Sequence, residues 1–134
     1  MTEIDGYIRA EEDGSLSFGD YTLDRKTKVL NFEQFGDSYD LKTYHDITKL
    51  DRNGLFVYES VPGTVVRNFQ MYDDELEFTV EGFEDTQIAL GLEADEEYRV
   101  YIDDVDVGSG KTNLGGKLII SVELGSGEKH IRVV

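Results

Sequence analysis

Apolar and polar residues alternate along most of the chain from residue 15 onward, which is the spacing of β-strands. The clearest case is Glu75–Glu81, where Leu76, Phe78 and Val80 share one face. Pairs rich in glycine, asparagine and aspartate separate the alternating runs and predict tight turns. We therefore expect strands over residues 15–18, 21–24, 28–34, 38–44, 55–61, 64–70, 75–81, 86–92, 98–102, 105–107, 117–124 and 128–134.

The first residues follow a different period. Ile4, Tyr7 and Ile8 are spaced as one apolar stripe of a helix. Thr2 stands at the capping position, with Asp5 three residues later. The pattern predicts a short N-terminal helix, which is too short to be stable without packing on the rest of the protein.

The fold class that follows is mostly β. The seven strands expected after residue 64 predict an antiparallel, immunoglobulin-like β-sandwich. The helix and a β-meander precede it. Pro62-Gly63 is the best candidate boundary, which divides the chain into residues 1–63 and 64–134. Two arrangements stay open: two separate units, or two halves that share one core.

Composition limits the classes of partner. The 134 residues include 13 Lys and Arg, 29 Asp and Glu and no Cys, for a net charge of −16. A disulfide framework and a cysteine metal site are excluded. An acidic surface disfavours nucleic acid and anionic membranes. We find no apolar run of the roughly 20 residues that a membrane span needs and no signal peptide, so we expect a cytoplasmic protein.

No set of residues predicts catalysis. Gly108-Ser109-Gly110-Lys111-Thr112 resembles the end of a phosphate-binding loop, but Val105 stands where that motif needs glycine. His45 is next to Asp46, yet no nucleophile completes a triad. We expect no enzymatic activity and assign no catalytic residue.

Three aspartates are the best metal candidates. Asp103, Asp104 and Asp106 offer carboxylate oxygens, which Ca²⁺ prefers, within four residues. The alternative is a hairpin turn, because aspartate favours turns by hydrogen bonding to nearby backbone. No other cofactor is expected.

Tyrosines are the best candidates for binding an organic ligand. A tyrosine ring gives a sugar a flat apolar face and a polar tip. The alternative is that these rings pack in the core or in an interface. The candidate ligand-binding residues are Tyr39, Tyr44, Tyr58, Tyr72 and Tyr101.

The last part of the chain carries a resemblance. Its turns and strands are residues 97–108 (EYRVYIDDVDVG), 112–118 (TNLGGKL), 121–127 (SVELGSG) and 131–133 (IRV). They resemble the C-terminal β-sandwich appendages of bacterial carbohydrate-active enzymes. The whole chain is similar to short bacterial proteins labelled endosialidase-like. The resemblance implies a β-sandwich and carries no catalytic motif that maps onto this sequence.

Three classes of function follow. The first is a non-catalytic interaction module that acts by self-association or protein assembly, because the N-terminal half is thin for a domain. It predicts a homo-oligomer that charges at Phe32 or Phe56 disrupt. The second is a carbohydrate-binding module, from the tyrosines and the resemblance. The third, a glycan hydrolase, has no supporting residues. We favour the interaction module.

Overall fold

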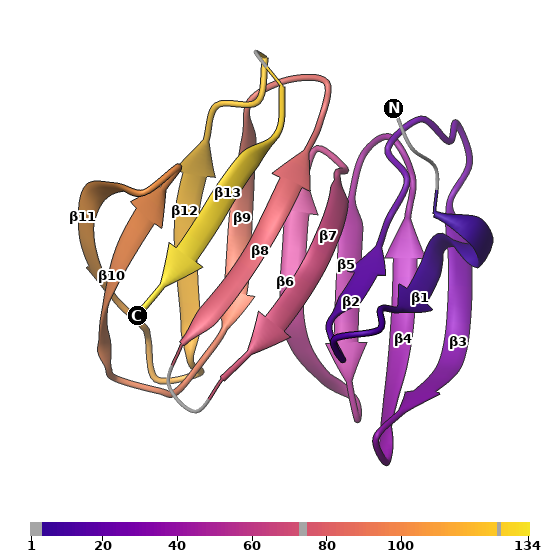
Figure 1. The fold of residues 1–134 in the computed structure, drawn as a ribbon, viewed down its shortest axis with the longest axis horizontal. Helices are drawn as coiled ribbons and strands as arrows, with labels where there is room; N and C mark the ends of the chain where they lie inside the picture. The colour runs from indigo at the N-terminus through magenta and orange to yellow at the C-terminus, as the bar shows by residue number, and fades with distance from the viewer. Residues whose placement is uncertain (1–3, 73–74, 126) are drawn as a thin grey trace.

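The computed structural model describes residues 4–72, 75–125 and 127–134, and almost all of its regular structure is β-strand (Figure 1). The one helical element described is a 3-10 turn, η1 (Asp5–Tyr7). The strands are β1 (Ile8–Ala10), β2 (Leu16–Phe18), β3 (Thr27–Gln34), β4 (Asp37–Thr43), β5 (Thr48–Arg52), β6 (Leu55–Val61), β7 (Val65–Met71), β8 (Leu76–Glu81), β9 (Thr86–Gly91), β10 (Glu97–Ile102), β11 (Val105–Lys111), β12 (Lys117–Val122) and β13 (Lys129–Val133).

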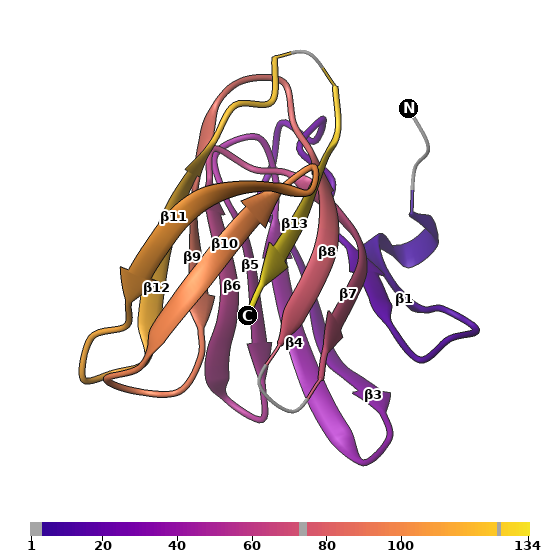
Figure 2. The same ribbon diagram turned by 60° about the vertical axis from the view of Figure 1, so that its left-hand side comes forward.

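These strands form two antiparallel sheets. Sheet 1 has seven strands in the order β1-β2-β7-β8-β13-β10-β11, and sheet 2 has six in the order β12-β9-β6-β5-β4-β3. The sheets lie in two layers, one in front of the other (Figures 1 and 2). The predicted antiparallel β-sandwich is confirmed, and the predicted meander forms the β3-β4-β5-β6 part of sheet 2.

The core lies between the sheets and is rich in aromatic rings. The ring of Tyr58 is edge-on to Phe18 at 5.3 Å and to Phe78 at 5.7 Å, and Phe69 lies 5.6 Å from Phe18. Edge-to-face contacts of this kind add to the stabilisation from burial. Phe18 and Tyr58 come before the candidate boundary at residue 63, and Phe69 and Phe78 come after it. One core cluster therefore draws on both parts of the chain.

The Pro62-Gly63 segment lies inside this packing. A Cβ atom at Gly63 would overlap the carbonyl oxygen of Tyr44. Directly after it, buried Thr64 is hydrogen bonded to the side chains of Tyr58 and Thr48. The segment therefore joins packed strands and is not an exposed linker.

The N-terminal helix was a wrong prediction. Only Asp5–Tyr7 form a 3-10 turn, and Gly6 and Tyr7 have φ angles of +71° and +69°, outside the helical region. Ile8 then enters β1 and pairs with Phe18 of β2. A strand at a sheet edge gains hydrogen bonds and buries Ile8, whereas a short helix containing glycine is unstable. Thr2, the predicted cap, lies outside the described residues.

Candidate functional site at the open end of the sandwich

The sandwich has two lateral ends, each flanked by one edge strand from either sheet. β11 and β12 flank one end, and β1 and β3 flank the other (Figure 1). We call them the open end and the closed end, because they differ in how their side chains fill the space between the sheets.

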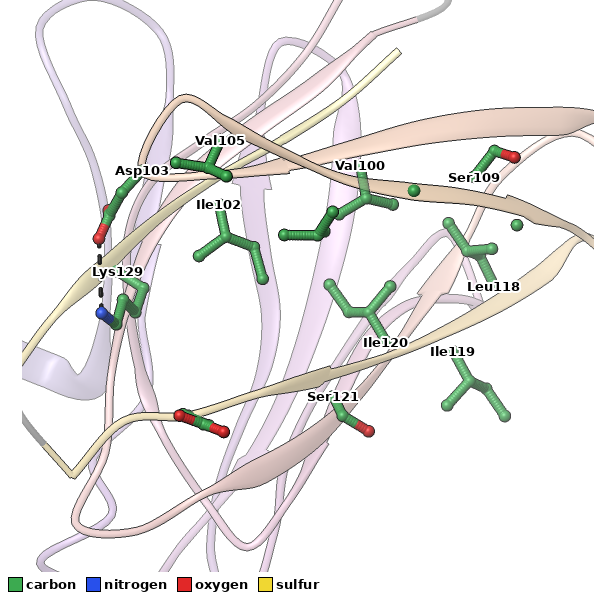
Figure 3. A pocket seen from close by; sticks show the side chains of 14 residues that line it. Val100, Ile102, Asp103, Val105, Ser109, Leu118, Ile119, Ile120, Ser121 and Lys129 are labelled. Atoms are coloured by element: carbon green, nitrogen blue, oxygen red, sulfur yellow. Dashed lines mark ion pairs between the residues drawn. The ribbon is translucent and has the colours of Figure 1, made fainter.

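A groove of about 580 Å³ occupies the open end. Its walls come from β10 and β11 on one side and from β12 on the other (Figure 3). The apolar side chains that line it are Val100, Ile102, Val105, Val107, Leu118, Ile119 and Ile120.

Glycines keep this groove open. Gly108 and Gly110 of β11 lie opposite Val100 and Tyr98, whose buried side chains face the core. A Cβ atom at Gly108 would meet nothing within 4 Å, whereas one at Gly110 would lie 2.9 Å from Cδ1 of Leu118, so the space is open at Gly108 and filled by Leu118 at Gly110. Val105 of the same strand lies on the inner face and is 61% exposed.

Of the four edge strands, β12 is the least protected against pairing with another strand. All six of its residues pair with β9 in unbroken register. The charged residues of this segment are Lys117, the first residue of β12, and Glu123, which directly follows the strand. Ile119, between them, has a side chain that is 59% exposed. At its start this edge is covered, because the backbone N–H and carbonyl of Lys117 are both hydrogen bonded to Asn113. From Ile119 onward the edge is regular and partly apolar, and such an edge invites strand addition.

The other three edges carry protective features. β1 has only three residues. β3 has a bulge between Val29 and Phe32, with Asn31 at a φ of +60°. β11 has an irregular register, and Gly108 has a φ of +120°. Short strands and bulges are devices that stop edges from pairing.

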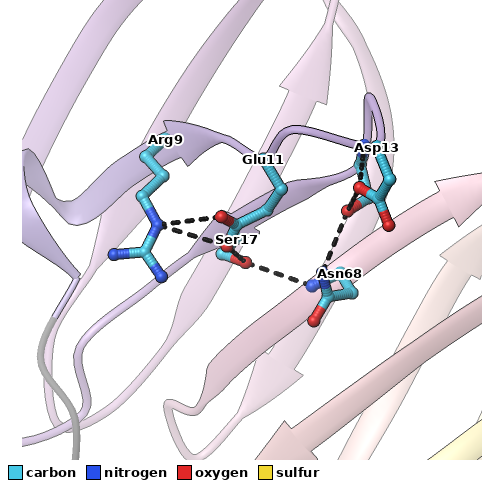
Figure 4. Close-up of polar contacts among 6 residues, drawn as sticks. Arg9, Glu11, Asp13, Ser17 and Asn68 are labelled. Atoms are coloured by element: carbon cyan, nitrogen blue, oxygen red, sulfur yellow. Dashed lines mark hydrogen bonds and ion pairs between the residues drawn. The ribbon is translucent and has the colours of Figure 1, made fainter.

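The closed end is tied across its strands by hydrogen bonds (Figure 4). Asn68 of β7 donates to the hydroxyls of Ser17 and Ser15, at 3.1 Å each. Ser17 in turn donates to Glu11, and Ser15 donates to Asp13. This network attaches β1 and β2 to the rest of sheet 1.

Contacts between the sheets complete the closed end. The side-chain amide of Gln34 in β3 donates to the carbonyl of Gly14 at 3.0 Å. Tyr7, Val29 and Phe32 pack against the core cluster at this end. Side chains therefore fill more of the space here than at the open end, and the groove that remains beside Gln34 and Gly14 is smaller, about 310 Å³.

Charged side chains gather at one end of the groove. At one end, Asp103 forms an ion pair with Lys129 at 3.5 Å, and the Glu123 side chain lines the groove nearby. The backbone N–H of His130 donates to Asp103, and this bond together with Lys129 holds the pKa of the Asp103 carboxyl below its usual value. Lys117 is exposed on the outer face of β12, where its ammonium lies 5.4 Å from the ring centre of Phe56.

The predicted metal ligands form a hairpin turn. Asp103 and Asp104 have φ angles of +51° and +66°, the left-handed pair that a two-residue turn between β10 and β11 requires. Asp106 accepts hydrogen bonds from Arg99 and from the Gly108 amide, at 2.9 Å each. Within residues 4–72, 75–125 and 127–134, no group of three or more His, Cys, Asp or Glu residues is placed to hold a metal ion. The arrangement of these aspartates is that of a hairpin turn, the alternative to a metal site.

The five predicted tyrosines do not come together in one site. Tyr58 is fully buried in the core and presents no face to a ligand, and Tyr39 is also buried. Arg132 lies 4.4 Å above the ring of Tyr101. Tyr72, about half exposed, donates a hydrogen bond to Gln70, and Tyr44 follows β4.

A stack of three rings was not predicted from the sequence. Phe83 stacks on His45 with centres 4.5 Å apart and on Tyr21 at 5.9 Å. The Tyr21 hydroxyl donates a hydrogen bond to Glu81 at 2.8 Å. Burial is the larger cause, and the Glu81 carboxylate the smaller one, that raises the pKa of Tyr21 to about 12. The three rings stand on separate loops, so no periodic pattern in the sequence brings them together.

Within the described part of the chain, no helix has the length and apolar character that crossing a bilayer requires. Comparison with known proteins finds no family model, no curated protein and no solved structure that matches this chain. The resemblance to endosialidase-like proteins and to carbohydrate-active enzymes therefore stays a prediction.

Proposed function

We propose that this protein is a non-catalytic interaction module that assembles with a second copy of itself through the open end of its sandwich. The observation that carries the proposal is the regular edge of β12 from Ile119 onward, beside an apolar groove. Strand addition at such an edge gains main-chain hydrogen bonds, and the groove beside it accepts apolar side chains. The sequence predicted self-association through the N-terminal half of the chain. The surface proposed here belongs instead to the last part of the chain.

The charges of β12 favour a second copy as the partner. Lys117 stands at one end of the strand and Glu123 just beyond the other. A copy rotated by 180° brings the lysine of one chain to the glutamate of the other. Isologous interfaces of this kind are self-complementary and produce closed dimers.

Net charge opposes this association, because each chain carries −16. Long-range repulsion between exposed charges is largely screened at physiological salt, where the Debye length is about 8 Å. We therefore expect assembly at moderate ionic strength.

Light scattering coupled to size exclusion tests the proposal on the untagged full chain at about 150 mM salt. We expect a mass above the 15.2 kDa of one chain. Ile119→Lys should dissociate the assembly, because it adds a charge to the middle of the β12 edge. Leu30→Lys is the matched control, since Leu30 lies on edge strand β3 and is also about 60% exposed. A monomer at every concentration, or equal effects of the two variants, would overturn the proposal.

A carbohydrate-binding module is the second candidate, and the stack of Tyr21, Phe83 and His45 favours it. Exposed rings give sugars an apolar face, and Glu81 beside Tyr21 supplies an acceptor. A glycan array followed by titration tests it. Saturable binding that Phe83→Ala removes and Ile119→Lys leaves unchanged would support this function. If no glycan on the array binds, the glycans tested are excluded as ligands.

A further inference from the structure

We propose that a second surface, the lower rim of the sandwich, binds an extended segment of another protein in which an acidic residue stands between two apolar ones. The lower rim is the end of the strands where the β3–β4 and β5–β6 hairpins lie, at the bottom of Figure 1. Its loops include residues 11–15, 35–36, 53–54, 92–96 and 112–116. The β12 edge from Ile119 onward is not part of it, so the inference goes beyond the proposed function and does not rest on it.

Two grooves lie along this rim. The first has about 310 Å³, lies toward the closed end and is lined by Phe35 among others. The second has about 580 Å³, and Leu55 and Tyr72 are among its lining residues. Arg52 and Met71 line both grooves. These two residues therefore stand where the grooves meet.

Arg52 has a positive charge that no acidic residue of the described chain pairs. Its guanidinium donates to Sδ of Met71 at 3.8 Å, and a thioether is a weak acceptor. Arg67, Arg99 and Arg132 of sheet 1, by contrast, each form an ion pair with a carboxylate. A guanidinium carries five N–H donors in a fork that matches a carboxylate. Arg52 thus keeps donors for a carboxylate that a partner supplies.

The described carboxylates that line the grooves have other roles. Asp13, Asp37 and Glu75 each accept a hydrogen bond from a side chain other than Arg52. Glu93 is exposed. The charge of Arg52 is therefore complemented by a carboxylate from outside the chain and not by these residues.

Exposed apolar side chains stand on both sides of Arg52. Phe35 on the side of the smaller groove is 84% exposed, and Leu55 on the other side is 73% exposed. Phe35 has a φ of +50° in the two-residue β3–β4 turn, which is rare for a bulky residue. The same position of the β5–β6 turn holds Asn53, which suits it. A strained, exposed ring where asparagine would fit better indicates a contact with a partner.

Hydrogen bonds of Asn53 hold the two hairpins together. Its backbone N–H donates to the carbonyl of Ser38 at 2.7 Å, and its side-chain oxygen accepts from the N–H of Ser38 at 2.9 Å. Its side-chain amide donates to Asp37 at 2.9 Å. Phe35 and Leu55 are thus presented on connected turns, which lowers the entropy that a partner must spend to order them.

These positions define the chemistry of the partner segment. Because Arg52 stands where the grooves meet, a carboxylate bound to it needs an apolar group on either side to use both grooves. Alternate side chains of an extended chain point the same way and are about 6.8 Å apart. A segment with apolar, acidic and apolar residues at alternate positions meets this requirement. A simple fatty acid has its apolar group on one side of the carboxylate only and would use one groove.

An array of synthetic peptides tests the proposal on the untagged full chain. The probes are nonapeptides blocked at both ends, with Leu, Ile, Val or Phe at positions three and seven, Glu or Asp at position five, and Gly, Ser or Thr elsewhere. We expect the best of them, followed by fluorescence anisotropy, to bind with a dissociation constant below about 1 mM. Gln in place of the central acid should weaken binding at least about tenfold, because it removes the charged partner of Arg52.

Arg52→Gln should weaken binding of the acidic peptides at least about tenfold and leave binding of their Gln counterparts unchanged. A loss of structure would weaken both, so this difference is specific to the charge. Lys49→Gln is the matched control, since Lys49 lies on the same strand and loses the same charge. It should change binding less than about threefold.

Phe35→Asn should weaken binding without lowering the melting temperature, because asparagine suits the turn. Leu30→Asn on β3 is its matched control, since Leu30 is also exposed but does not line either groove of the rim. Circular dichroism checks that each variant is folded.

The outcomes are distinct from those of the assembly test. Absence of binding by every peptide of the array, or equal binding of the acidic and Gln peptides, would overturn this inference. Displacement of the peptide by an equal concentration of octanoate would also overturn it, because the site would then take a small acid. Ile119→Lys should leave peptide binding unchanged, and Arg52→Gln should leave the mass from light scattering unchanged. Failure at the lower rim is therefore separable from failure of assembly at the open end.

Discussion

The two ends of the sandwich close their sheets in different ways. At the closed end, Tyr7, Val29 and Phe32 pack against the core, Gln34 bridges to Gly14, and a groove of about 310 Å³ remains. At the open end, two of the positions of β11 that face inward hold glycine, and a larger groove of about 580 Å³ remains. The comparison teaches that strand order alone does not close a sandwich. The side chains on the inner face of the edge strands decide whether an end is sealed or stays available to a partner.

The largest expected difference is in stability. Ile8→Ala removes a buried side chain of the closed end and should lower the free energy of unfolding by about 2–4 kcal/mol. Ile119→Ala at the open end should change it by less than about 0.5 kcal/mol, because that side chain is mostly exposed in the single chain. Urea unfolding at a concentration where the protein is monomeric measures both. Equal losses would mean that the two ends are packed alike.

Hydrogen exchange compares the edges without mutation. As the protein concentration rises through the dissociation constant, amides of β12 should exchange at least about tenfold more slowly, because pairing protects them. Amides of β3 should not change, since that edge is bulged. Slower exchange at β3 instead would assign the interface to the closed end.

Salt should change the association of two chains and should not change the folding of either end of the sandwich. Between about 10 mM and about 150 mM salt, the dissociation constant should fall about threefold, because repulsion between the acidic chains is screened. Analytical ultracentrifugation across this range measures it. Weaker association with rising salt would indicate that local ion pairs outweigh the net repulsion.

Acid pH gives the smallest effect, and both ends contribute. The hydroxyl and amide of Ser15 lower the pKa of Asp13 at the closed end, and the His130 amide lowers that of Asp103 at the open end. A carboxyl whose folded pKa is depressed stabilises the fold above its ordinary value of 3.8, and this contribution is lost as pH falls through the folded pKa.

Asp13→Asn and Asp103→Asn remove these carboxyls while keeping residues that suit turns. Thermal unfolding between pH 5 and pH 2.5 should show a smaller loss of stability in each variant than in wild type. A variant that follows the wild-type curve over the whole range would show that its carboxyl is not linked to folding.

Alternation predicted most strands because it reflects burial on one face. β8 is the clearest example, since Leu76, Phe78 and Val80 are buried as the pattern required. β5 was not predicted, because its five residues include three charged ones and carry little apolar signal. Residues 21–24 were predicted as a strand but form turns. Local pattern therefore identifies strands with one apolar face and misses short charged ones.

The candidate site was beyond such reasoning. The predicted strand ended at residue 107, whereas Gly108 and Gly110 lie within β11. Their effect depends on which strand faces them, and that follows from strand order. Residues far apart in sequence, such as Val100 and Ile120, line the same groove only because β10 and β12 end up at the same side of the sandwich.

The position of β13 has a consequence for how the protein is made. This strand lies between β8 and β10, so it joins two parts of sheet 1 that are otherwise not paired with each other. Ile131 pairs with Phe78 on one side and with Ile102 on the other. Sheet 1 therefore cannot close until residues 129–133 have left the ribosome. Such long-range pairing is also slow, which leaves the edges of β8 and β10 exposed to chaperones or to other nascent chains in the meantime.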